Sequence, residues 1–215
     1  MRIIIYPPER LRVHAQLPAS KSISNRALVI QALAAQNCAG QVSEVRNLSD
    51  CDDTQVMLRA LSTMPDVIDI MAAGTAMRFL TAYLSITPGT HTITGTERMR
   101  HRPIGILVDA LRELGAAVEY AAEDGFPPLR ITGRSLQGGA LELAGSVSSQ
   151  YISALLMIAP MMEQGLTLTL TGNIVSRPYI DMTLAIMGTF GAKARWQDGR
   201  TLRVEPVKYA PTPYT

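Results

Sequence analysis

Residues 18–28, PASKSISNRAL, are the stretch from which the fold of this chain can be worked out. A proline and a loop of small residues lead into a segment in which apolar residues recur at helical spacing. The loop therefore places Lys21 and Ser22 at a helix N-terminus, where free backbone N–H groups and the helix dipole favour an anion. Arg26, one turn further on, can make a two-pronged contact to phosphate or carboxylate. Taken alone, the stretch is explained at least as well by a capping serine and a solvated lysine.

The order of loop, apolar helix, strand, loop and second helix recurs three times along the chain. In the loop before the first helix, the matching residues lie 53 and 74 positions apart: Ser22, Thr75 and Ser149. In the second helix they lie 53 and 76 positions apart: Leu61, Leu114 and Phe190. These offsets predict a threefold repeat of one α/β unit, in which the first unit is shorter because it lacks a full hairpin before Ala72. Repeated units bury a shared core, so we expect an α/β fold with helices inside and sheets outside.

Alternating residues predict the strands of this repeat. We expect single strands at residues 2–6, 11–17, 40–46, 67–71, 90–97 and 165–172, and hairpins at 117–133 and 193–206. Residues 1–17 contain strands without partners, and residues 207–215 lack periodicity and carry two prolines. We therefore expect a three-unit domain at 18–206, strands at 1–17 that belong to a second domain absent from this chain, and a linker to that domain at 207–215.

The composition excludes several classes of function. Hydrophobic residues at 47% and charged residues at 18% are ordinary for a soluble globular protein. A net charge of +2 gives no argument for nucleic acid, and the aromatic content of 5% is low for a single-strand binder. Cys38 and Cys51 match no metal or redox spacing, and the three histidines form no ligand cluster. The most apolar segment, residues 151–162, is too short to span a bilayer. We expect a cytoplasmic protein.

Loops at matching ends of the three units share hydroxyl groups, glycine backbone and guanidinium groups. Their residues are Lys21, Ser22 and Arg26; Gly74, Arg78 and Arg102; and Ser148, Ser149, Gln150, Ser176 and Tyr179. Such groups stabilise phosphate and carboxylate oxygens through charge-assisted hydrogen bonds. Structural explanations stand beside this one: Gly74 can serve close packing, Arg78 can pair with a buried acid, and Asp52 and Asp53 can stabilise a helix N-terminus. The loops predict a site for a small anionic, hydroxyl-bearing ligand, with no acid, base or nucleophile evident.

Five segments, in this order, carry a resemblance to a known family: PASKSISNRAL, AGTAMRFL, RHRPIGILVDAL, GSVSSQYISALLM and SRPYID. Together they resemble the 3-phosphoshikimate 1-carboxyvinyltransferase (EPSP synthase) family over residues 18–206. The resemblance implies transfer of the carboxyvinyl group of phosphoenolpyruvate to the 5-hydroxyl of shikimate 3-phosphate, with release of phosphate. It also implies two similar domains, each of three βαβαββ units, and a monomer that uses no cofactor, metal, nucleic acid or membrane.

The resemblance also implies roles for individual residues. Lys21 would be shared by both substrates at the hinge, and Gln150 would lie between them. Shikimate 3-phosphate would contact Ser22, Arg26, Ser148, Ser149, Ser176 and Tyr179. Gly74 and Arg102 would contact phosphoenolpyruvate and, with Lys21, form the site where glyphosate competes. The family's acid and base carboxylates would lie in the absent half, so we expect this chain to be inactive alone.

Two positions depart from the family pattern. Many members have proline where this chain has Phe79, and asparagine where it has Ala72. These departures leave the affinity for phosphoenolpyruvate and the sensitivity to glyphosate open.

Three alternatives remain. A UDP-N-acetylglucosamine enolpyruvyltransferase would share the fold, but it lacks the SKSxSNRAL pattern and uses a loop cysteine. A non-catalytic module that binds a phosphorylated metabolite would bind without turnover. An RNA-processing relative would need a basic stripe and a catalytic histidine, which the sequence does not show.

Overall fold

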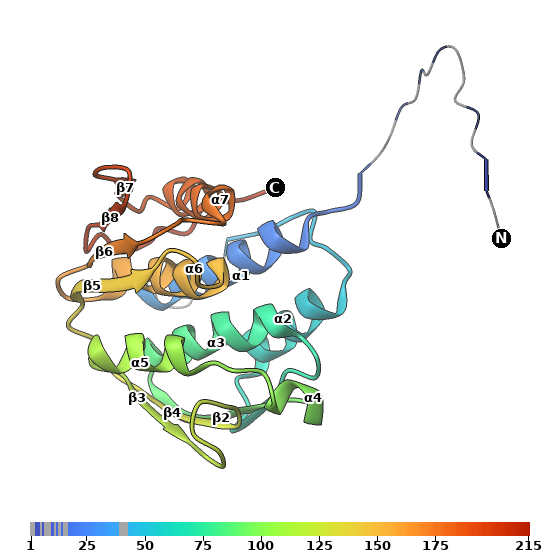
Figure 1. The fold of residues 1–215 in the computed structure, drawn as a ribbon. Coiled ribbons are helices and arrows are strands. Elements are labelled where there is room, and N and C mark those ends of the chain that lie inside the picture. Colours follow the sequence, from blue (N-terminus) through green and yellow to red (C-terminus); the bar gives the residue numbers. More distant parts are fainter. Residues whose placement is uncertain are drawn as a thin grey trace.

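The computed structural model describes residues 17–38 and 43–215 without a break, together with residues 3, 4, 6, 10, 12 and 14. Two four-stranded sheets form in the described part, and helices lie between them (Figure 1). The strand order is β1-β2-β4-β3 in one sheet and β5-β6-β8-β7 in the other. Each sheet therefore has the same layout of strands.

The second and third units have the same succession of elements. The second consists of β1 (Val67–Asp69), α3 (Gly74–Ile86), β2 (Gly89–Thr94), the short α4 (Glu97–Arg100), α5 (Gly105–Glu113), β3 (Ala117–Tyr120) and β4 (Leu129–Gly133). The third consists of β5 (Gly139–Ala144), α6 (Ser149–Ile158), a 3₁₀ turn at Ala159–Met161, β6 (Leu166–Thr171), α7 (Arg177–Thr189), β7 (Ala194–Trp196) and β8 (Thr201–Val204).

Strand pairing confirms that these two units repeat. In each, the first two strands are parallel and are joined through a helix. The last two strands form an antiparallel hairpin, and its second strand pairs antiparallel with the unit's second strand. Both are therefore βαβαββ units. Strand β5 was not among the predicted strands.

The first unit is reduced to two helices in the described residues, α1 (Lys21–Asn37) and α2 (Asp52–Thr63). Only residues 64–66 separate α2 from β1, which leaves no room for a hairpin. Of the strand predicted at 40–46, residues 43–46 are described, and there Val45 makes a single parallel bridge to Tyr214. The strands predicted at 2–6 and 11–17 fall largely outside the described residues. Among the described residues the second and third units each form a sheet, and the first unit lacks a hairpin, as the shorter spacing predicts.

Helices form the core, as predicted. Helix α3 is buried from Gly74 to Ser85, and α6 is buried from Tyr151 to Ile158. Both helices are mostly apolar around their whole circumference, which is typical of helices in a protein interior. The strands are buried on one face only: in β6 the three leucines are inaccessible, while the threonines between them are partly exposed. One face of that sheet thus closes the core.

Residues 207–215 lie against the domain, although they form no helix or strand apart from the Tyr214 bridge. Tyr209 is buried, and its hydroxyl donates a hydrogen bond of 2.8 Å to the Met157 carbonyl. The Tyr214 ring stacks on Phe190 at 5.8 Å. Whether this segment leads to a second domain stays a prediction.

Candidate functional site

A cavity of about 270 Å³ lies where four helices begin. Its lining residues are Lys21, Ser22, Arg26, Thr75, Ser148, Ser149, Gln150 and Tyr179. They come from the first turns of α1, α3, α6 and α7 and the loop before α6, with Arg26 in the second turn of α1. Each helix start presents backbone N–H groups without helical partners and the positive end of a dipole. The cavity is therefore suited to an anion.

Local sequence explains two of these helix starts. The Ser20 hydroxyl accepts a hydrogen bond from the Ile23 N–H at 3.5 Å and caps α1. Ser148 caps α6 by accepting from the Gln150 N–H at 3.3 Å. Serine is a preferred capping residue because its oxygen satisfies a free N–H of the first turn. The caps fix the helix starts at Lys21 in α1 and at Ser149 in α6.

Arg26 is the buried cation of this cavity, with 2% of its surface exposed. Its Nε donates to Thr183 Oγ1 at 2.7 Å, and its Nη2 donates to Ser153 Oγ at 2.9 Å. Its Nη1 donates to the Ser22 carbonyl at 2.8 Å. A guanidinium carries five N–H groups, so two remain beyond these three bonds.

No carboxylate in the described part of the chain forms an ion pair with Arg26. Burial lowers the pKa of Arg26 to about 10, against a smaller opposite effect of Tyr179. The guanidinium therefore stays charged near neutral pH. A buried, charged arginine without an acidic partner favours binding of an anion from solution.

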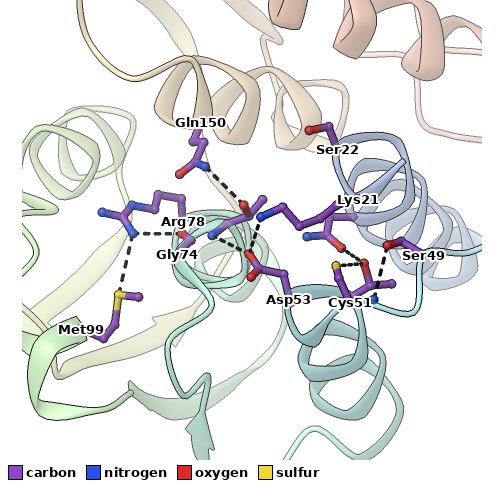
Figure 2. Close-up of polar contacts among 12 residues, drawn as sticks. Lys21, Ser22, Ser49, Cys51, Asp53, Gly74, Arg78, Met99 and Gln150 are labelled. Carbon is purple, nitrogen blue, oxygen red and sulfur yellow. Dashed lines mark hydrogen bonds and ion pairs between the residues drawn. The ribbon is translucent and has the colours of Figure 1, made fainter. Parts of the chain in front are cut away.

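Lys21, Asp53 and Thr75 form a polar link between α1, α2 and α3 (Figure 2). Lys21 Nζ lies 3.7 Å from Asp53 Oδ1, and the same oxygen accepts a hydrogen bond of 3.3 Å from the Thr75 N–H. The Lys21 side chain is 48% exposed, so it remains accessible to a ligand. An anion in the cavity would compete with Asp53 for this ammonium.

A second cavity, of about 440 Å³, lies near Gly74. It is lined by Ala72, Thr96, Arg98, Met99 and Arg102. A Cβ on Gly74 would collide with Arg102 Nη1 and would lie 3.1 Å from Arg78 Nη1. Two guanidinium groups therefore lie against the bare backbone of Gly74, and a side chain there would displace one of them.

Arg78 is buried without an acidic partner among the described residues. Its Nη1 donates to the Gly74 carbonyl at 3.0 Å, and its Nη2 donates to the Pro103 carbonyl at 3.4 Å (Figure 2 shows the first). Burial lowers its pKa, as does the positive charge of Arg102, while Tyr151 opposes the shift. The alternative that Arg78 pairs with a buried acid is wrong.

The two cavities bring together most of the residues named from the sequence. Seven line the first cavity: Lys21, Ser22, Arg26, Ser148, Ser149, Gln150 and Tyr179. Arg102 lines the second, with Gly74 directly beneath it. Ser176 lines neither; it precedes α7, one turn before Tyr179. Gln150 Nε2 donates to Thr75 Oγ1 at 3.3 Å and so joins α6 to α3 (Figure 2).

Sequence reasoning named Arg78 among the loop cations without assigning it a ligand, and it assigned no ligand contact to Thr75 or Asp53. Thr75 marked the repeat and belonged to the loop before the second unit's first helix, and its place at that helix start was the available signal. Asp53 was assigned to its own helix N-terminus, where it does lie, but it also contacts Lys21 and Thr75. Among the described residues, no group of three or more histidine, cysteine or acidic side chains could hold a metal ion. No helix in that part of the chain is long and apolar enough to cross a membrane.

Comparisons with a family model and with curated proteins identify the same family. The model of the family EPSP synthase (3-phosphoshikimate 1-carboxyvinyltransferase) matches residues 5–69 and 62–214. A 3-phosphoshikimate 1-carboxyvinyltransferase of Bacteroides fragilis (strain YCH46) is 60% identical over 215 residues, which are 100% of this chain and 51% of that protein. One of Shewanella halifaxensis is 40% identical over 89% of this chain and 50% of its own length. This chain thus spans about half the length of the curated relatives that it matches.

Solved structures agree on the fold. EPSP synthase from Acinetobacter baumannii superposes with a TM-score of 0.77 at 22% identity, covering 93% of this chain and 49% of that one. The enolpyruvyl transferase NikO from Streptomyces tendae superposes with a TM-score of 0.64 at 15% identity, covering 96% of this chain and 52% of that one. At these identities the likeness concerns the fold alone.

Proposed function

Because this chain belongs to the EPSP synthase family, we propose that its protein transfers the carboxyvinyl group of phosphoenolpyruvate to the 5-hydroxyl of shikimate 3-phosphate. Phosphate is the second product. This chain supplies the three-unit domain that binds much of shikimate 3-phosphate, and residues outside it supply the acid and base. The two substrates are small molecules, and we expect a cytoplasmic monomer that needs no nucleic acid, membrane or cofactor.

One observation carries this proposal: a buried guanidinium without an acidic partner lies where several helix starts converge. Arg26 is charged and inaccessible to bulk water, and serine hydroxyls and backbone N–H groups surround the same cavity. A phosphate group receives charge-assisted hydrogen bonds from such groups. The ring hydroxyls of shikimate 3-phosphate suit the remaining polar lining, including Gln150 and Tyr179. We assign Ser22, Arg26, Ser148, Ser149, Ser176 and Tyr179 to this substrate.

Phosphoenolpyruvate is assigned to the neighbouring region around Gly74 and Arg102. The bare backbone of Gly74 lets a guanidinium approach the start of α3, where an anion is also favoured by the helix dipole. Lys21 can reach toward both sites once an anion replaces Asp53 as its partner. Gln150, which donates a hydrogen bond to Thr75 at the start of α3, is assigned a place between the two substrates. This assignment puts the two anionic substrates in neighbouring sites, which is what transfer between them requires.

Binding and kinetics test the proposal. The full-length protein should release phosphate from phosphoenolpyruvate only when shikimate 3-phosphate is present. Calorimetry should show that shikimate 3-phosphate binds at least tenfold more tightly than shikimate, which lacks the phosphate that Arg26 would contact. Equal affinities would contradict the assignment of this cavity. Turnover with UDP-N-acetylglucosamine instead would favour the related transferase, and binding without turnover in the full-length protein would favour a non-catalytic module.

A further inference from the structure

The partners of Arg26 are all neutral. Ser153 on α6 and Thr183 on α7 are both fully buried, and each accepts a hydrogen bond from the guanidinium. The third acceptor is the Ser22 carbonyl. These groups fix the plane and direction of the guanidinium without cancelling its charge.

The hydroxyl hydrogens of this cluster can be assigned. Thr183 donates its hydroxyl hydrogen to the Tyr179 carbonyl at 2.8 Å. Thr183 Oγ1 must then act as the acceptor in its 2.9 Å contact with Ser153 Oγ, so Ser153 donates there. With both hydroxyl hydrogens used in this way, both oxygens face Arg26 as acceptors only. The pair of hydroxyls therefore acts as a rigid acceptor for one arginine.

Two aromatic rings complete the surroundings. The guanidinium carbon of Arg26 lies 5.3 Å from the centre of the Phe79 ring and 6.0 Å from that of Tyr179. Such rings attract a cation through their quadrupole and, like the hydroxyls, carry no net charge. Phe79 is fully buried.

We propose that Ser153, Thr183 and Phe79 are positioning residues that hold Arg26 while leaving its charge for the phosphate of the ligand. The proposal rests on the proposed function for the identity of that ligand. A carboxylate in place of either hydroxyl would orient Arg26 equally well, but it would also neutralise it. A bound anion would then compete with an ion pair instead of a neutral acceptor.

A matched pair of variants separates charge from shape. Ser153→Asp and Ser153→Asn add side chains of nearly equal size, and only the first is charged. In the full-length protein, calorimetry with shikimate 3-phosphate should show at least tenfold weaker binding for Ser153→Asp than for Ser153→Asn. The melting temperature of the Asp variant should equal or exceed that of the Asn variant, because its carboxylate pairs with Arg26. Equal affinities in the two variants would overturn the proposal.

Thr183 and Phe79 provide independent checks. Thr183→Val removes the acceptor of Arg26 Nε and should weaken binding of shikimate 3-phosphate several-fold, whereas Thr183→Ser should restore it. Phe79→Leu keeps an apolar side chain but removes the ring, and it should weaken binding about threefold. Unchanged affinity in both Thr183→Val and Phe79→Leu would show that these residues only pack.

Inorganic phosphate distinguishes failure of this proposal from failure of the proposed function. If the unmodified protein binds shikimate 3-phosphate but the Asp and Asn variants do not differ, the function stands and the positioning role is wrong. If the unmodified protein binds inorganic phosphate but not shikimate 3-phosphate, the proposed substrate is wrong. Weaker binding of inorganic phosphate by Ser153→Asp than by Ser153→Asn would then still support the positioning role. If neither anion binds, both proposals are wrong.

Discussion

Gly74 shows how one missing side chain shapes the second cavity. Its Cα lies beneath the Arg102 guanidinium, so the methyl group of Gly74→Ala would displace that group. We expect the KM for phosphoenolpyruvate to rise about tenfold, which corresponds to a loss of roughly 1.4 kcal/mol of binding free energy. The affinity for shikimate 3-phosphate should change less than twofold. Gly188→Ala on α7 is the matched control, because a Cβ there meets nothing within 4 Å. An unchanged KM in Gly74→Ala would mean that Arg102 does not contact this substrate.

Arg26 gives a second prediction for a single residue. Arg26→Ala removes charge-assisted hydrogen bonds worth about 1.5–3 kcal/mol, so binding of shikimate 3-phosphate should weaken roughly tenfold or more. Titration calorimetry measures the change. Arg177→Ala is the control, because Arg177 also begins a helix but lies over the Trp196 ring at 4.1 Å and does not line the cavity. Retained affinity in Arg26→Ala would show that this arginine is structural.

The neighbours of Arg26 also show where sequence reasoning stops. Lys21, Ser22 and Arg26 could be identified as candidate ligand contacts because a helix start is recognised from neighbouring residues in the sequence. The two side-chain acceptors of Arg26, Ser153 and Thr183, lie 127 and 157 residues away along the chain. No spacing rule connects residues so distant, so Ser153 looked like one more residue in an apolar helix.

Among the elements, the strands show the same limit. The alternation LTLTLT predicts β6 because buried leucines and partly exposed threonines follow one another. Strand β5 lies at the edge of its sheet and pairs only with β6, which follows α6 in the sequence. Its stability comes from that distant partner, and the short GALELA pattern gave little local indication of it. The reduction of the first unit, in contrast, was visible in the shorter spacing of the repeat.

The C-terminal segment offers a test at the level of elements. Tyr209→Phe keeps the buried ring but leaves the Met157 carbonyl without this hydrogen bond, so the free energy of unfolding should fall by about 1–3 kcal/mol. Tyr214→Phe is the control, because the Tyr214 ring stacks on Phe190 while its hydroxyl makes no hydrogen bond within the described residues. Urea denaturation compares the two. Equal stabilities would show that ring packing alone holds residues 207–215 on the domain.

At the scale of the whole molecule, the arrangement of units creates the site. Each unit contributes at least one helix start to the first cavity, and no unit alone brings together the lining residues. A net charge of +2 conceals this local concentration of cations. The repeat in the sequence predicts that the loops are equivalent, and the fold adds that their helix starts converge.

The convergence of the three units on one cavity leads to a prediction for the isolated 215-residue chain. It contains the proposed contacts to shikimate 3-phosphate, but it spans about half the length of its curated relatives. We expect it to bind shikimate 3-phosphate more weakly than the full-length protein, because closure over the ligand and the contacts of the remaining half are missing. We also expect no release of phosphate from phosphoenolpyruvate, since no carboxylate or histidine among the described residues lines the cavity, and the nearby Asp53 already pairs with Lys21. Circular dichroism should first establish that the chain is folded, and a phosphate-release assay with both substrates then decides. Turnover by the folded 215-residue chain would place the acid and base within the residues described above and would contradict their assignment to the other half.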